Sequence, residues 1–336
     1  MIAAEAGVSL PTVSKVLNGR SDVAADTRQR VERLLRDRHY LRPGGRTGRP
    51  SGLVELLFTQ IDSPWAVELL RGVEDYLAEH RRAVVVGAIR HSTDASGSAG
   101  WTGSPIGPQP DGVILVSSDL SADQWHDLGR RGLPIVVIDP ANVPGPDIPS
   151  VGATNWAGGI AATEHLLALG HRRIAVVSGS REILCSRARV DGYRFALERA
   201  GIAVDPALVR FGEFRQQSGF DCAHELLALP DPPTAMFAGS DQQALGVYEA
   251  VRRLGLTIPG DLSVVGFDDL PVARWLSPPL TTVRQPLGAI GRVAAEMLVR
   301  RIDDAGFCTQ RMELATELIV RESTEAPAAD MRRHSA

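Results

Sequence analysis

The chain has 336 residues, 44% of them hydrophobic and 23% charged, and its formal net charge is −4 at pH 7. This length predicts two or three domains, and the composition is typical of a globular protein with a full core. The sequence contains no signal-peptide pattern and no apolar run near the roughly 18 residues that span a bilayer, so we expect a cytoplasmic protein without a membrane partner. Three scattered cysteines without metal-ligand spacing are expected to be free thiols.

Charge is distributed unevenly along the chain. Residues 1–50 contain ten Lys or Arg and five Asp or Glu, whereas the remainder holds 26 of the 36 basic and 35 of the 40 acidic residues. A basic head on an acidic body indicates a small nucleic-acid-binding module attached to a domain with another task. The alternative is a chance fluctuation in an arginine-rich sequence.

The head carries the pattern of three short helices. A first helix is expected to end at Gly7, and Ser9 is a good N-cap for a second helix with Pro11 in its first turn. Asn18-Gly19 ends the second helix, and a third is expected from about Thr27. Together they indicate a helix-turn-helix motif, whose second helix enters the major groove of DNA. A three-helix core with a solvated face is the alternative.

Apolar runs alternate with amphipathic segments beyond a linker rich in Pro, Gly and Arg, Leu41 to Gly52. Seven runs are predicted to be strands: LVELLF, AVVVGAI, GVILVS, PIVVID, RIAVVSG, TAMFAGS and LSVVGFDD. Helical stretches such as WAVELLRGVEDYLAEH and QQALGVYEAVRRLGL lie between them. The pattern therefore predicts parallel sheets of βαβ units in two layers, with a Gly- and Pro-rich loop over residues 92–110.

Two stretches of the head, IAAEAGVSLPTVSKVLNG and VAADTRQRVERLLRDRHYLRP, resemble the head of the LacI/GalR family of bacterial transcription repressors. The resemblance continues to about Glu322. It implies an α/β fold class: a small all-α helix-turn-helix head followed by two doubly wound parallel-sheet subdomains, similar to periplasmic sugar-binding proteins. Three crossovers would join the subdomains, and a small molecule would bind between them.

The resemblance also implies the domain organisation. We expect a helix-turn-helix domain over residues 1–43, a hinge linker over 44–52, an effector-binding body over 53–322 and a disordered tail over 323–336. Within the body, the N-terminal subdomain is expected over about 53–155 and 285–312, and the C-terminal subdomain over about 156–284 and 313–322.

Residues of the second helix fall on the family's DNA-contacting positions. The resemblance places Leu10, Pro11 and Lys15 at base-reading positions and Ser9, Thr12, Ser14, Asn18 and Thr27 at phosphate contacts. Leu10 and Pro11 have no hydrogen-bonding side chain, so base readout there would be apolar, for instance against a thymine methyl group. Val13, Val16 and Leu17, on the other side of the helix, are expected to hold it to its partners.

Three departures from the family concern the head. The family has a few more residues before Ile2, so we expect the first helix to be truncated here and the true start to lie upstream. The segment from Gly44 to Pro50 cannot easily be helical, and Arg46 and Arg49 are expected to enter the minor groove as flexible arms. Ala24 stands where a hydroxyl usually caps the third helix.

Several candidate effector-binding residues fall at the ends of predicted strands, where ligands of open parallel sheets bind. The resemblance points to Trp65, Asp139, Arg189, Phe214, Ser240 (in place of the family's Asn), Asp241, Asp268 and Gln285. Carboxylates, an arginine and an amide suit a polyol, and an aromatic ring can stack on a sugar. Singly, each residue has a structural alternative: Asp268 as a helix cap, Arg189 in an ordinary ion pair, or Trp65 in the core.

These features predict a sugar-responsive transcriptional repressor that acts as a homodimer on operator DNA. No phosphate loop, Gly-rich nucleotide fingerprint or metal-ligand spacing occurs, so we expect neither an enzyme nor a cofactor. Two alternatives remain: a cytoplasmic sugar-binding protein without effective DNA binding, and a glycoside hydrolase that uses two of the aspartates.

Overall fold

The computed structural model describes residues 3, 6–17, 23–37, 50–89, 109–116, 120, 125, 128–129, 132–142, 148–304, 306–307 and 311–327. The predictions for Asn18, Arg46, Arg49 and nearly all of the loop over 92–110 lie outside these residues. The chain divides into two compact units, residues 1–49 with 121–133 and residues 50–120 with 134–336. Among the helices that are described, none is long and apolar enough to cross a membrane.

The head contains helices α2 (Leu10–Leu17) and α3 (Ala25–Asp37). As predicted, Gly7 takes a left-handed conformation (φ 64°) that suits a helix end, and the Val8 N–H donates back to the Ala3 carbonyl. Ser9 is the predicted N-cap, because its hydroxyl accepts the Thr12 N–H at 3.3 Å. The third helix begins at Ala25, two residues before the predicted start. A small core holds the helices together and consists of Ala3, Ala6, Val13, Val16 and Val31.

The first sheet of the body has the strand order β11-β5-β4-β3-β1-β2, and its neighbouring strands are parallel. Its strands are β1 (Leu53–Phe58), β2 (Ala83–Ala88), β3 (Gly112–Val116), β4 (Ile135–Ile138), β5 (Ser150–Ala153) and β11 (Met312–Leu314). Helices α4 (Pro64–Glu79) and α11 (Leu287–Asp303) pack against this sheet, and their apolar faces share its core. We call this assembly the N-terminal subdomain.

The second sheet has the order β12-β10-β9-β8-β6-β7 and is parallel except for β12 against β10. Its strands are β6 (Ile174–Ser178), β7 (Val209–Phe211), β8 (Ala235–Ala238), β9 (Ser263–Asp268), β10 (Thr281–Arg284) and β12 (Glu317–Ile319). Its helices are α6 (Asn155–Ala168), α7 (Leu184–Arg199), α8 (Gln216–Leu227), α9 (Asp241–Arg253) and α10 (Pro271–Trp275), with a 3₁₀ turn at Pro206–Leu208. We call this assembly the C-terminal subdomain.

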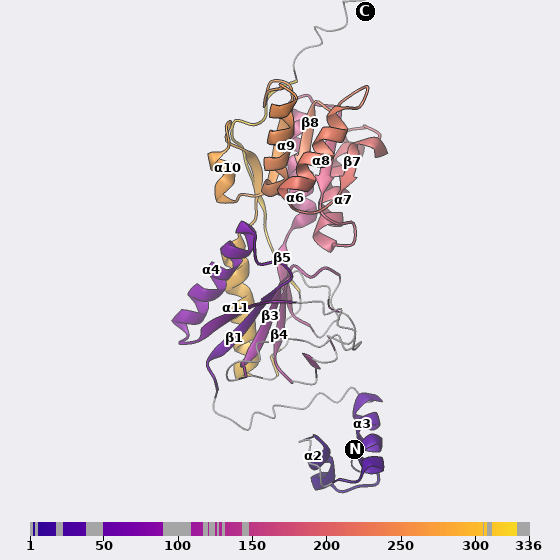
Figure 1. The fold of residues 1–336 in the computed structure, drawn as a ribbon, viewed down its shortest axis with the longest axis vertical. Helices are drawn as coiled ribbons and strands as arrows, with labels where there is room; N and C mark the ends of the chain where they lie inside the picture. Colours follow the sequence, from indigo (N-terminus) through magenta and orange to yellow (C-terminus); the bar gives the residue numbers. More distant parts are fainter. Residues whose placement is uncertain are drawn as a thin grey trace, which may run out of the picture. The chain divides into compact units, whose positions relative to one another are not determined.

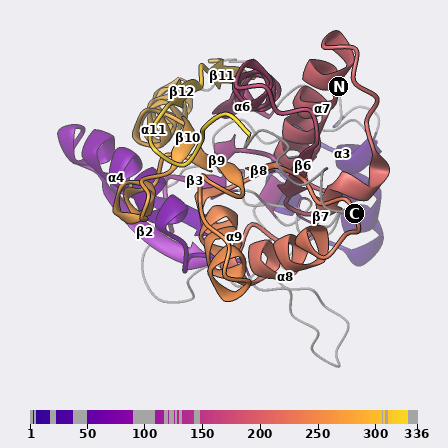
Figure 2. The ribbon, with the colours of Figure 1, turned by 90° about the horizontal axis from the view of Figure 1, so that it is seen from above.

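Helices cover both faces of the second sheet (Figures 1 and 2). One core lies between the sheet and α6 and α7, and a second lies between the sheet and α8 and α9. The chain passes between the subdomains three times: from β5 to α6, from β10 to α11, and from β11 to β12. These connections bring the ends of strands from both sheets to one region of the body.

All seven predicted strands are strands in the structure, and the two quoted helical stretches correspond to α4 and α9. The fold class is therefore confirmed as two α/β assemblies with doubly wound, mainly parallel sheets. The prediction missed β5, β7, β10, β11 and β12, each of which has only three or four residues. Although the sequence predicts a tail from residue 323, Ser323 is buried, and its hydroxyl donates to the Val264 carbonyl at 2.6 Å.

Candidate functional site

The second helix of the head presents polar residues on an exposed side. Ser9, Pro11 and Lys15 are exposed and Thr12 is half-buried, and the hydroxyls of Ser9 and Thr12 lie 2.9 Å apart. Thr27 is half-buried within α3. Val13 and Val16 are buried on the opposite side, as the sequence predicts. The side chains of Leu10 and Ser14 lie outside the described part of the chain.

A buried chain of polar contacts links four residues from different elements of the body. The Arg189 Nε on α7 donates to the Asn155 Oδ1 at the start of α6 at 2.8 Å, and its Nη1 donates to the Gly239 carbonyl. Arg189 Nη1 also lies 3.9 Å from the Asp268 Oδ1 at the end of β9. Gln285, in the connection from β10 to α11, donates its Nε2 to the same Asp268 oxygen at 2.6 Å. Two of these four residues, Asn155 and Gln285, thus lie where the polypeptide passes between the subdomains.

Aromatic rings flank the Arg189 guanidinium. Its Cζ atom lies 3.8 Å from the centroid of the Phe267 ring and 5.1 Å from that of Phe214. Both distances allow a cation–π interaction, which is strongest where water is excluded. The ring of Phe214 also takes the space over Gly179, because a Cβ atom there would lie 2.4 Å from it. Phe214 therefore packs over the arginine and helps to exclude water from it.

The charge of Arg189 acts on two buried carboxyl groups. Asp139 follows β4 and is buried with its backbone in the left-handed region (φ 43°). Burial raises the pKa of Asp139 and of Asp268, and the charge of Arg189 acts against that rise in both. The charge of Arg311 also acts against the rise in the pKa of Asp139, so the site sets two buried carboxyl groups against the charges of two arginines.

Ser240 and Asp241, at the start of α9, bind groups of the protein itself. The Ser240 hydroxyl caps the helix by accepting the Gln243 N–H at 3.1 Å. The fully buried carboxylate of Asp241 accepts the Thr282 hydroxyl at 2.6 Å and the Leu270 N–H at 2.7 Å. Both side chains thus stabilise the ends of neighbouring strands. This is a structural role, in place of the predicted contact with an effector.

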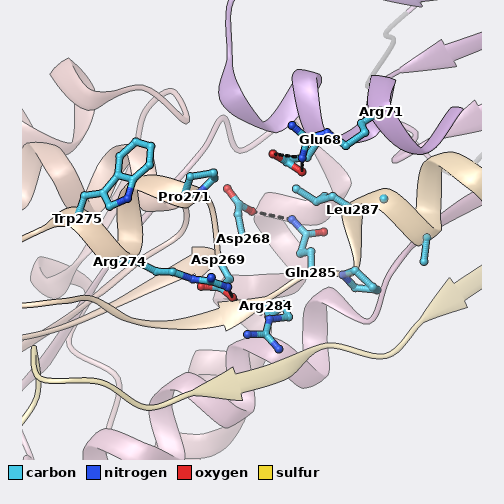
Figure 3. Close-up of a pocket in the computed structure, with 13 residues that line it drawn as sticks. Glu68, Arg71, Asp268, Asp269, Pro271, Arg274, Trp275, Arg284, Gln285 and Leu287 are labelled. Atoms are coloured by element: carbon cyan, nitrogen blue, oxygen red, sulfur yellow. Dashed lines mark hydrogen bonds and ion pairs between the residues drawn. The ribbon is translucent and has the colours of Figure 1, made fainter. Parts of the chain in front are cut away.

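Two cavities adjoin the chain of polar contacts. The larger, about 450 Å³, is lined by Asp268 and Gln285 together with Arg71, Arg274, Trp275 and other residues of α4, α10 and α11 (Figure 3). The smaller, about 300 Å³, is lined by Asp139, Asn155, Cys185, Arg311 and Glu313 among others. Of the predicted residues, Trp65, Arg189, Phe214, Ser240 and Asp241 line neither cavity, and Trp65 packs against the N-terminal core.

Sequence reasoning missed Asn155 and Asp269. Asn155 lies two residues after the end of β5. Recognising this short strand in the sequence would have pointed to Asn155 as a residue at a strand end. The side chain of Asp269 is 2% exposed; it accepts the Arg284 Nε at 2.7 Å and also binds Arg321. Among the residues that the structure describes, no cluster of His, Cys, Asp or Glu could hold a metal ion.

Comparison with known proteins gives matches over the head and the body. Residues 2–42 match the model of the bacterial regulatory proteins of the lacI family, and residues 163–324 match that of a periplasmic binding protein-like domain. The HTH-type transcriptional repressor CytR of Escherichia coli (strain K12) is 34% identical over 328 residues, which cover 97% of this chain and 95% of that protein.

Two solved structures are similar over nearly the whole chain. A complex of the transcriptional regulator CelR with cellobiose has a TM-score of 0.74 and 34% identity, and the match covers 96% of this chain and 98% of that one. The lac repressor dimer bound to operator and the anti-inducer ONPF has a TM-score of 0.70 and 27% identity, with coverages of 97% and 98%.

The buried carboxyl of Asp268 predicts a pH-dependent stability. Burial raises its pKa to about 7, so the folded protein binds a proton that the unfolded chain releases at lower pH. The contribution of this group to stability is complete below its unfolded pKa and is lost as the pH rises through the folded pKa. From about pH 5 to 7 we expect the unfolding free energy of the wild type to fall relative to Asp268→Asn, by up to about 1.4 kcal/mol per pH unit.

Urea denaturation of both proteins across this pH range measures the difference. Asp221→Asn, at an exposed position of α8, is the matched control. A wild-type-minus-Asp268→Asn difference that is independent of pH would contradict the prediction.

Proposed function

Because the chain belongs to the LacI family of bacterial regulatory proteins and is a DNA-binding transcriptional regulator, we propose that a small sugar-like effector, held between its two α/β subdomains, controls its binding to operator DNA. It is a regulator and not an enzyme. The observation that carries the proposal is the buried chain Asn155–Arg189–Asp268–Gln285, which joins strand ends of the C-terminal subdomain to connections that lead into the N-terminal subdomain.

The head supports the DNA-binding part of the proposal. Its exposed positions on α2 include Lys15 and Pro11, and the apolar side is occupied by the small core. We propose Ser9, Leu10, Pro11, Thr12, Ser14, Lys15, Asn18 and Thr27 as DNA contacts, with Arg46 and Arg49 in the minor groove. Two heads must reach successive half-sites, which a two-fold homodimer on a near-palindromic operator provides. The protein would act in the cytoplasm, where its operator is.

The mechanism we propose is a change in the relative orientation of the subdomains. An effector that contacts Asp139 from one subdomain and Asp268 from the other binds one orientation better than another. It thereby shifts the population toward that orientation and changes how the two heads are spaced. A coupling of about 1–3 kcal/mol, typical of such systems, changes operator occupancy about 5- to 150-fold.

The polar groups of the site favour an uncharged, hydroxyl-rich effector. The charge of Arg189 acts on both Asp139 and Asp268, and among the described residues the buried Gln285 Oε1 has no hydrogen-bond partner. These oxygens need donors, which hydroxyl groups supply. A phosphate group would bring further negative charge beside two buried carboxyls and be repelled.

The first prediction concerns operator binding. Fluorescence anisotropy should show tight binding to DNA from upstream of the protein's own gene and at least tenfold weaker binding to a scrambled duplex, across a salt series. Lys15→Ala should weaken specific binding by about 1–3 kcal/mol, the usual value of a lost base contact. Arg253→Ala, on the exposed face of α9 in the body, is the control. Weak binding that is equal for both duplexes and disappears with salt would leave only phosphate attraction and count against the proposal.

The second prediction concerns the guanidinium. Arg189→Ala should abolish the effect of the effector on operator binding, because Asp268 and Asn155 both lose their buried partner. Operator affinity without effector should stay within about threefold of the wild type, since Arg189 belongs to the body and not to the head. The response is measured by anisotropy with a panel of neutral sugars. An equal loss of DNA binding in the variant would argue against the site.

The third prediction concerns the charge of the effector. Isothermal titration with matched pairs, D-ribose against ribose 5-phosphate and D-glucose against glucose 6-phosphate, should show binding of neutral members at least tenfold tighter than their phosphates. Asp268→Asn should reduce this ratio, because it removes one carboxyl from the site. Glu198→Gln is the control: it lies nine residues beyond Arg189 on α7, about 14 Å along the helix. Tighter binding of a phosphate would refute the charge argument.

A further inference from the structure

Helix α10 belongs to the cores of both subdomains. Leu270, immediately before it, is 1% exposed and lies in the core of the N-terminal subdomain, against which Val272 also packs. Ala273 is fully buried in a core of the C-terminal subdomain, and its carbonyl accepts the Leu280 N–H at 2.8 Å. The chain from Leu270 to Ala273 is therefore an apolar link between the two assemblies, two residues from Asp268 in the proposed effector site.

The backbone that joins Asp268 to this link is strained. Asp268 (φ 116°) and Asp269 (φ 57°) are consecutive residues in the left-handed region, which side chains other than glycine rarely adopt. Such a conformation persists only where the surroundings hold it. Gln285 holds Asp268, and Arg284 and Arg321 hold Asp269. We call Asp268, Asp269 and Leu270 the corner after β9. Its first two residues are thus each held by side-chain contacts.

Asp241 holds the third residue of the corner. Its carboxylate accepts the Leu270 N–H at 2.7 Å and the Thr282 hydroxyl at 2.6 Å, and it is completely buried. The carboxylate also packs closely over β9, because a Cβ atom on Gly266 would lie 2.4 Å from its Oδ1. It therefore fixes α9, β10 and the corner to one another, and its two oxygens are occupied by protein donors rather than directed into either cavity.

We propose that Asp241 is a positioning residue for effector control: by binding the Leu270 N–H, it makes Asp268 and the Leu270 side chain move as one unit. The inference rests on the proposed function, since it assumes that an effector contacts Asp268. An effector that displaces Asp268 then seats or withdraws Leu270 in the core of the N-terminal subdomain. Apolar packing converts a polar contact into a change of subdomain orientation, because packed cores accept discrete arrangements rather than gradual deformation.

A first test needs no effector. Hydrogen–deuterium exchange of peptides covering residues 269–276 reports the strength of the corner, because the Leu270 N–H is protected by Asp241. Asp241→Asn replaces one acceptor oxygen with an amide donor, with little change in size, and should raise exchange there at least tenfold. Asp221→Asn on α8 is the matched control. Unchanged exchange in Asp241→Asn would overturn the proposal, whether or not the protein binds an operator.

A second test separates positioning from contact with the effector. If Asp241 positions the corner, Asp241→Asn should leave the Kd for cellobiose and for D-ribose, whichever binds, within about threefold of the wild type. The ratio of operator Kd with and without that sugar should fall by about 2- to 30-fold, the range found for residues that carry coupling. An increase in the sugar Kd equal to that in Asp268→Asn would instead make Asp241 an effector contact and refute the proposal.

A third test concerns the apolar end of the link. Leu270→Ala should reduce the same ratio without changing the sugar Kd, and Leu270→Met, which keeps the volume, should restore it. Leu254→Ala, at an exposed leucine that follows α9, is the control. Equal ratios in Leu270→Ala, Leu270→Met and the wild type would refute the role of Leu270. Failure of the wild type to bind either sugar or an operator would count against the proposed function, while the exchange experiment would still decide the role of Asp241.

Discussion

The buried pairing of Arg189 with Asp268 is the interaction on which the arrangement of the proposed site depends. A guanidinium and a carboxylate lose several kcal/mol each on leaving water, and they recover it only when every remaining donor and acceptor finds a partner. Asn155, the Gly239 carbonyl and Gln285 provide those partners, and each comes from a different element. The requirement to satisfy one arginine therefore brings the start of α6, the ends of β8 and β9 and the β10–α11 connection to the same place.

The apolar strands could be predicted from the sequence, whereas the roles of most polar residues at strand ends could not. Long apolar runs such as LVELLF identify buried strands reliably, because parallel strands covered on both faces are apolar throughout. β10 reads TTVR, and its polar residues are explained only by tertiary contacts, such as Thr282 with Asp241. Asp268 could be placed at a strand end from sequence, whereas Asn155 and Gln285 follow β5 and β10, two four-residue strands that the sequence did not predict. Ser240 binds the Gln243 N–H, and Asp241 binds the Leu270 N–H and the Thr282 hydroxyl. No pattern in the sequence distinguishes such structural contacts from contacts with a ligand.

The replacement of asparagine by Ser240 illustrates this ambiguity in physical terms. Serine is among the best N-cap residues, and its hydroxyl is already used by the Gln243 N–H of α9. A longer amide could cap the helix and still extend beyond it, whereas the shorter hydroxyl reaches little further. Polar recognition then falls to the groups that remain, chiefly Asp139, Arg189, Asp268 and Gln285. Affinity for one effector rather than another would depend on Asp139, Asp268 and Gln285, which line the two cavities, and on Arg189, which lies beside Asp268.

An effector that binds the Asp268 Oδ1 gains affinity there only by replacing a contact that the protein already makes. Arg189 donates to Asn155 and Gly239, and Asp268 accepts from Gln285, so a hydroxyl that binds Asp268 competes with an existing hydrogen bond. The net gain from such an exchange is about 0.5–1.5 kcal/mol per bond, far less than the gross strength of the bond. Weakening the Gln285–Asp268 contact, however, also loosens one support of the strained corner at Asp268 and Asp269. Breaking the Gln285–Asp268 hydrogen bond therefore both lowers the affinity for the effector and releases the corner. A site that responds to its effector in this way has only modest affinity for it.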